Sequence, residues 1–315
     1  MKQKGKVDGK KLLDTTDINK EFENLNEYLS VLHDCFLAIA MDYKHYVDNS
    51  FTNNDIYEIR DDVNYRFFSA RLHIELLIKQ HFQIEHRFEK YMKTEPKVFA
   101  NYLSKNPYYD YAEKEVSSIF DSFLYHLTSV FDYLSTLSNY TCGEPKDKQK
   151  KLKWTNLSRS VRDSSNHFGK KMALSEKIKD CDNTFVNKLY GYRSYLIHEK
   201  SEQSMYSFTF HLSNQKETAI DANFIATERL IKQFSDLRKL SKDNYISIKY
   251  VTFWLINKAI DITIDILFAL SEDMKQNPLI SFGMFAYFDE ETKMGLPVST
   301  PYWRKIKRYI ENKRK

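Results

Sequence analysis

Residues 21–47 read EFENLNEYLSVLHDCFLAIAMDYKHYV, and the spacing of their apolar side chains indicates the fold class. The apolar groups follow one another at alternating steps of three and four residues, at Phe22, Leu25, Leu29, Leu32, Phe36, Ile39, Tyr43 and Tyr46. Such spacing keeps one stripe of a helix facing a neighbouring helix for several turns. The stretch therefore predicts a long helix that packs against near-aligned neighbours, as in helix bundles.

Other parts of the chain repeat this pattern. Residues 63–91 and 116–137 have the same stripe, and further helices are predicted over 180–200, 221–241 and 246–272. The chain has only 7 Gly and 6 Pro in 315 residues. Average usage would supply about 22 and about 16. So few helix-breaking residues favour long uninterrupted helices, and the sequence predicts an all-α fold, a helix bundle.

Two short segments have the period of a β-strand instead. Residues 206–212, YSFTFHL, alternate large apolar and polar side chains, and a turn is plausible at residues 213–216. Residues 279–288, LISFGMFAYF, precede DEETKMG and could form a hairpin near the C-terminus. We therefore expect one or two small β-hairpins beside the helices.

The net charge of +5 is unevenly distributed. Residues 304–315 carry +6 and residues 1–11 carry +4, which leaves −5 for the chain between them. A further basic run, KDKQKKLK, occupies residues 146–153 in a predicted connector. The basic ends have two interpretations: they contact phosphates, or they solubilise frayed termini.

Targeting and redox signals are sparse. No uncharged run exceeds 13 residues, and the N-terminus lacks an apolar signal segment. The three cysteines, Cys35, Cys142 and Cys181, are odd in number and far apart. These observations predict a protein of the reducing cytoplasm, with no membrane span.

Most candidate sites have simpler interpretations. The chain has no G-x-G-x-x-G loop and no G-x-S-x-G elbow. His81 lies on an apolar stripe, where a core histidine is the simpler interpretation. Asp42 and His45 form half of a helical carboxylate–histidine metal motif, but no second half accompanies them. We therefore predict neither a metal site nor a cofactor.

The segment 183–200, NTFVNKLYGYRSYLIHEK, is patterned differently from the other helices. At 100° per residue, four polar side chains and one glycine share the side opposite the apolar stripe: Asn183, Asn187, Gly191, Ser194 and His198. Glycine costs up to about 1 kcal/mol inside a helix, so its presence there suggests close approach by a backbone or ligand. Arg193 projects between the polar and apolar faces.

Arg193 and His198 form an R-x-x-x-x-H motif, and with it the chain resembles the HEPN superfamily of helical bundles. Ser194 takes the position after the arginine, which is often Asn, Asp or His in that family. A preceding helix at 117–137, a following strand pair and a closing amphipathic helix extend the resemblance over about 110–272. It implies a HEPN-like core at 106–275, with N-terminal helices at 1–105 and a β-containing basic extension at 276–315.

The resemblance implies a metal-independent endoribonuclease that dimerises so that two motifs face one cleft. His198 would exchange protons during attack by an RNA 2′-hydroxyl, Arg193 would bind the phosphate, and Ser194 would hydrogen-bond the imidazole or the phosphate. The products would be a 2′,3′-cyclic phosphate and a 5′-hydroxyl. Such a protein would act as a toxin or an anti-phage defence effector, with an antitoxin or defence-system partner.

An alternative hypothesis is a non-catalytic helical module that binds a nucleotide, RNA or a protein. The acidic body favours it, because RNA affinity depends on neutralised phosphates. If RNA is the substrate, basic residues of the connector and the C-terminal end should lie near the cleft: Lys150, Lys151, Lys153, Arg304, Lys305, Lys307 and Arg308.

Overall fold

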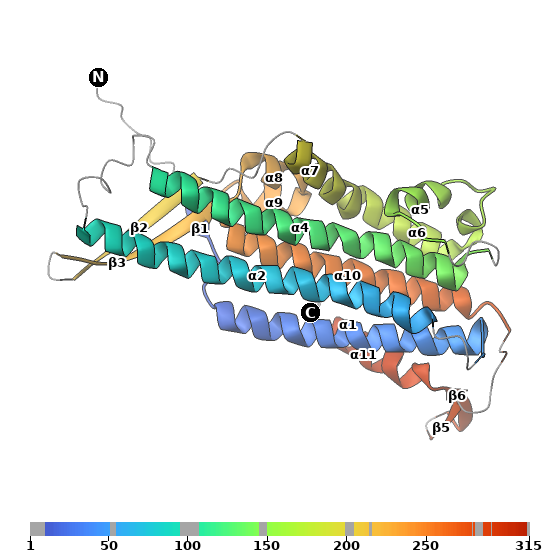
Figure 1. Cartoon of the computed structure of the whole chain (residues 1–315). Helices are drawn as coiled ribbons and strands as arrows, with labels where there is room; N and C mark the ends of the chain where they lie inside the picture. Colours follow the sequence, from blue (N-terminus) through green and yellow to red (C-terminus); the bar gives the residue numbers. More distant parts are fainter. Residues whose placement is uncertain are drawn as a thin grey trace. The chain divides into compact units, whose positions relative to one another are not determined.

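A computed structural model gives the fold of the chain (Figure 1). It describes residues 10–50, 55–94, 107–144, 150–198, 205–213, 216–278, 280, 286–290 and 292–313. For residues 107, 108, 205–213, 216–222 and 286 the description is limited to the backbone. Every structural statement below refers to these residues.

The fold is an all-α helical bundle, as predicted. Its long helices are α1 (Ile18–Tyr46), α2 (Asp55–Thr94), α4 (Pro107–Cys142) and α10 (Ile248–Met274). The first three contain the apolar stripes found in the sequence, and α10 corresponds to the helix predicted over 246–272. In α1, Leu25, Leu32, Phe36 and Ile39 are all at most 1% exposed, so the stripe is a core face.

Shorter helical elements fill the rest of the chain. They are α5 (Trp154–Ser160), the 3-10 turn η1 (Phe168–Lys170), α6 (Met172–Cys181), the π-helix η2 (Asp182–Val186), α7 (Asn187–His198), α8 (Glu228–Gln233), α9 (Ser235–Leu240) and α11 (Ser299–Lys313). The predicted helix at 180–200 therefore begins earlier, at Met172, and contains a π turn.

Three strand pairs accompany the helices. Strands β2 (Met205–Ser213) and β3 (Lys216–Ile225) are antiparallel, which confirms the strand predicted at 206–212. Strands β5 (Ala286–Asp289) and β6 (Met294–Pro297) also pair, while residues 279 and 281–285 of that predicted hairpin lie outside the described residues. A pair absent from the sequence analysis joins β1 (Lys11–Leu13) in parallel to β4 (Asn244–Ile246).

The helix predicted over 221–241 is wrong in its first part and interrupted in its second. Residues 221–225 complete β3, because a strand of nine residues at 205–213 takes a partner of similar length. Helix α8 starts only after Thr227, whose hydroxyl accepts a hydrogen bond from the Leu230 amide at 3.2 Å. Phe234 has an extended backbone and separates α8 from α9.

The described chain divides into two compact units, each assembled from separate segments. The first comprises residues 1–18, 69–125 and 188–256, and the second residues 19–68, 126–187 and 257–315. The first unit contains β1 to β4, α8, α9 and nearly all of α7. The second contains nearly all of α1, with α5, α6, β5, β6 and α11. The three ranges proposed from the sequence stay a prediction.

Asp42 anchors the C-terminal helix inside the second unit. Its carboxylate is fully buried and accepts hydrogen bonds from Ser271 Oγ at 2.6 Å, Trp303 Nε1 at 2.8 Å and Ser299 Oγ. Trp303, Ile306 and Ile310 of α11 are buried as well. The described part of the basic C-terminal end is therefore a packed helix and not a frayed terminus.

His81 is a core histidine in the first unit, as predicted. It is 3% exposed, and its ring meets that of Phe224 edge-on at 4.7 Å between centres. Within the described part of the chain, no helix has the length and apolar character needed to span a membrane.

Candidate functional site

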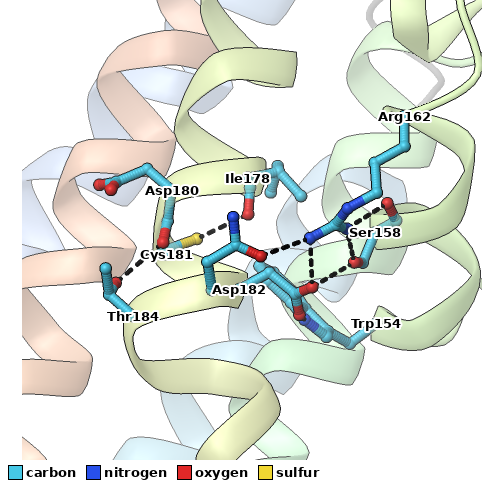
Figure 2. Close-up of polar contacts among 9 residues, drawn as sticks. Trp154, Ser158, Arg162, Ile178, Asp180, Cys181, Asp182 and Thr184 are labelled. Atoms are coloured by element: carbon cyan, nitrogen blue, oxygen red, sulfur yellow. Dashed lines mark hydrogen bonds and ion pairs between the residues drawn. The ribbon is translucent and has the colours of Figure 1, made fainter.

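The elements α6, η2 and α7 follow one another without a break. The side chain of Asp182 anchors them at the π turn (Figure 2). Asp182 is 8% exposed, and its carboxylate accepts hydrogen bonds from Trp154 Nε1 at 2.7 Å, Ser158 Oγ at 2.6 Å and Arg162 at 2.8 Å. A buried carboxylate needs such partners, since burial without them is costly. This cluster is structural and belongs to the second unit.

The π turn changes the position expected for Asn183. A π turn holds more residues than an α turn, so the spacing of 100° per residue does not continue across Asp182–Val186. The side-chain oxygen of Asn183 accepts a hydrogen bond of 2.9 Å from Arg162. Asn183 and Asn187 are exposed and belong to the second unit, while residues from 188 onward belong to the first.

Helix α7 presents an exposed face to solvent in the first unit. Gly191, Ser194 and His198 are all exposed, whereas Leu189 and Tyr192 are fully buried. Spacings of three and four residues place the three exposed positions on one side of the helix. The structure therefore brings together this part of the predicted polar face.

Gly191 has open space around it. A Cβ atom built at this position would meet no atom within 4 Å, apart from the backbone of its own helix turn and its chain neighbours. No described part of the chain thus takes advantage of the missing side chain.

Arg193 lies at the edge of this face and turns toward α4. Its guanidinium carbon is 4.8 Å from the centre of the Tyr125 ring, a cation–π geometry. The side chain is half-buried, and its Nε is buried without a hydrogen-bond partner among the described residues. Tyr125 is 46% exposed, so the pair lies at the surface of the unit.

A second arginine lies at the opposite edge and was missed by the sequence analysis. Arg229 of α8 is exposed, and its guanidinium carbon lies 3.4 Å from the centre of the Tyr195 ring of α7. Tyr195 is one residue after Ser194 and three before His198. No spacing in the sequence links Arg229 to this helix; its only signal is the Thr227 cap that precedes α8.

Asp121 is a half-buried acid on α4, one helical turn before Tyr125. Burial raises the pKa of its carboxyl group to about 6. Its Oδ1 atom is buried and, in the part of the chain that the structure describes, has no hydrogen-bond partner. The first unit therefore holds an acid that is costly to ionise, four residues before the aromatic partner of Arg193.

The predicted RNA-binding cations belong to the second unit, unlike Arg193, Ser194 and His198. Arg304 forms an ion pair with Asp289, and Lys305 lies 2.7 Å from Asp34. Lys307 borders a groove that also contains Glu272 and Glu311. The exposed residues Lys150, Lys151, Lys153 and Arg308 complete the set.

Metal-binding and thiol groups are the remaining candidates among the described side chains. They contain no group of three or more His, Cys, Asp or Glu residues arranged to hold a metal ion. Asp42, half of the motif noted in the sequence, is occupied by its hydrogen bonds to α10 and α11. Burial raises the pKa of the Cys35 and Cys181 thiols, which disfavours the reactive thiolate.

No family model, curated protein or solved structure matches this chain. The likeness to the HEPN superfamily therefore rests on the motif and the order of elements.

Proposed function

We propose that the protein is a metal-independent endoribonuclease of the HEPN type, with Arg193, Ser194 and His198 at its site. One observation carries this proposal: Ser194 and His198 are exposed on α7, and each of the two residues beside Ser194 in sequence belongs to a cation–π pair. Arg193 is held on Tyr125 and Arg229 on Tyr195. Such an arrangement suits a flexible polyanion, because arginine binds phosphate with two hydrogen bonds at once.

The chemistry follows from these side chains. His198 takes the proton from an RNA 2′-hydroxyl, and the 2′-oxygen forms a bond to the neighbouring phosphorus. The bond from phosphorus to the 5′-oxygen breaks, and that oxygen receives a proton. An arginine stabilises the added negative charge on the phosphate oxygens. The products are a 2′,3′-cyclic phosphate and a 5′-hydroxyl, and the reaction needs no metal ion.

A second copy of the chain would complete the site. The reaction has one proton to remove and another to supply, and one His198 from each of two copies can divide these tasks. Gly191, with open space around it, leaves room for another backbone to approach α7. We expect a homodimer in which the two α7 faces border one cleft.

The test is cleavage of single-stranded RNA by the purified protein in EDTA. We expect fragments that end in a 2′,3′-cyclic phosphate, and an oligonucleotide with 2′-deoxyribose at the cut position should resist cleavage. Cleavage of the deoxy substrate, or cleavage that needs a divalent metal, would contradict the mechanism.

A second candidate function is a non-catalytic module that binds RNA, a nucleotide or a protein. The position of Arg193 favours it, since its guanidinium packs on Tyr125 and its Nε atom is buried, which leaves less of the side chain to meet a reacting phosphate. Binding without cleavage would support this alternative, provided that Arg193→Gln lowers the affinity while His198→Ala does not.

A further inference from the structure

The first unit contains a pocket that the proposed function does not use. It lies among β4, α8, α9 and Lys10, and its volume is about 540 Å³. Pockets for small molecules typically measure about 300–1,000 Å³ and combine apolar walls with a few polar groups. This pocket has both: its floor includes the buried residues Ile225, Ile231 and Ile246.

Cations dominate the rim. Lys10, Lys232 and Arg238 border the pocket together with one acid, Glu228, so the charged lining carries +2. Lys232 and Glu228 form an ion pair at 2.7 Å. Arg238 is exposed and, among the described residues, has no ion pair. The pocket thus offers two cations beyond the one that Glu228 neutralises.

Backbone pairing brings Lys10 to this place. Lys11 of β1 pairs with Asn244 of β4, and the Lys10 ammonium donates to the Ser241 carbonyl oxygen at 3.1 Å. The Lys10 ammonium also lies 5.7 Å from the centre of the Tyr245 ring. Tyr245 borders the pocket and is half-buried, so a cation and an aromatic ring meet at one side of it.

A ligand for this pocket must be anionic at one end and apolar at the other. A planar group can pack against Tyr245 and the isoleucine floor. A phosphate monoester carries a charge of about −1.5 to −2 at neutral pH, which matches the +2 of the lining better than a carboxylate does. Arg238 can bind its oxygens in a bidentate manner, with Lys10 as a point charge.

We propose that this pocket binds a phosphorylated molecule with a planar apolar group, of the size of a nucleoside monophosphate. The same chemistry is offered by a free mononucleotide and by the terminal nucleotide of a nucleic acid chain. The proposal does not depend on the nuclease, because no residue of the pocket is part of the α7 site.

Calorimetric titration of the full-length chain tests the proposal. The probes are 5′-AMP, 5′-GMP, 5′-CMP and 5′-UMP, with adenosine and inorganic phosphate as partial ligands. We expect at least one mononucleotide to bind at one site per chain, and at least about tenfold more tightly than either partial ligand. No binding at millimolar concentration, or equal binding of adenosine or phosphate, would overturn the proposal.

Charge-reversal variants locate the binding. Arg238→Glu and Lys10→Glu should each weaken the affinity at least about tenfold, whereas Lys239→Glu, an exposed residue of the same helix α9 outside the pocket, should not. Equal affinity in all three variants would place the ligand elsewhere and overturn the proposal. Because three exposed positions are compared, misfolding of one variant leaves the others decisive.

A 5′-phosphorylated deoxy-trinucleotide distinguishes the two ligand sources, since it lacks the 2′-hydroxyl that cleavage needs. Competition with the mononucleotide would show that the pocket binds the terminal nucleotide of a nucleic acid chain. Failure to compete, with mononucleotide binding intact, would assign it to the free nucleotide.

Discussion

The guanidinium carbon of Arg229 lies 3.4 Å from the centre of the Tyr195 ring, although α8 and α7 are separated in sequence by a β-hairpin. This contact fixes a cation beside the exposed face that carries Ser194 and His198. Arg229 belongs to no recognisable sequence motif, yet it contacts the helix that contains the R-x-x-x-x-H motif.

Arg229 should therefore contribute to RNA binding. In a His198→Ala background, where cleavage cannot obscure affinity, we expect Arg229→Gln to weaken RNA binding and to lower the salt dependence of log Kd by about one phosphate contact. Fluorescence anisotropy at several salt concentrations measures both. Arg159→Gln, an exposed arginine on α5, is the control. An unchanged salt dependence in Arg229→Gln would rule out a contact between Arg229 and an RNA phosphate.

Replacement of Gly191 should raise the stability of the fold and lower the rate of the proposed cleavage. Gly191→Ala has no steric obstacle within the described chain, so the fold should gain up to about 1 kcal/mol from the better helix former. If a second copy or RNA approaches this face closely, the same change should lower cleavage, and Gly191→Leu should lower it further. Denaturant unfolding and cleavage rates of both variants give the two readouts. Full cleavage by Gly191→Leu would show that nothing approaches here.

The sequence predicted the bundle better than the site, for physical reasons. The stripe of α1 depends on local spacing, and its Leu25, Phe36 and Ile39 are buried as expected. The role of Arg229 could not be predicted, because its contact with Tyr195 depends on how the β2–β3 hairpin places α8 beside α7. The error at 221–225 has a similar origin. These residues have the apolar spacing of a helix, but they form part of β3 because β2 is present to pair with them.

Asp121 should make stability depend on pH. Its pKa is raised to about 6 by burial, whereas an aspartate in an unfolded chain titrates near 3.9. The unfolded chain thus loses this proton first, and stability falls as the pH rises through the interval from about 4 to about 6. We expect Asp121→Asn to be more stable than the parent at about pH 8, by about 1–2 kcal/mol after allowance for solvent screening.

At about pH 4 the Asp121→Asn variant and the parent should differ much less, because Asp121 is then protonated in the folded chain and about half protonated in the unfolded chain. Urea unfolding at the two pH values measures the difference. An equal gain in stability at both values would mean that the charge of Asp121 is not the cause.

Asp182 should be essential to the fold. Asp182→Ala removes the acceptor for Trp154 and Ser158 and leaves Arg162 without its buried partner, so we expect a loss of about 3 kcal/mol or more. Asp180→Ala, an exposed carboxylate nearby (Figure 2), should change stability by less than about 0.5 kcal/mol. Chemical denaturation compares them, and similar losses in both would contradict the structural role of Asp182.

The most direct test of the account is the RNA cleavage rate of His198→Ala in EDTA, compared with His86→Ala. His86 is an exposed histidine on α2 of the same unit, outside the proposed site. We predict that His198→Ala loses at least about 100-fold in cleavage rate while circular dichroism and melting stay those of the parent, and that His86→Ala cleaves normally. Cleavage by folded His198→Ala at the rate of the parent would contradict the account.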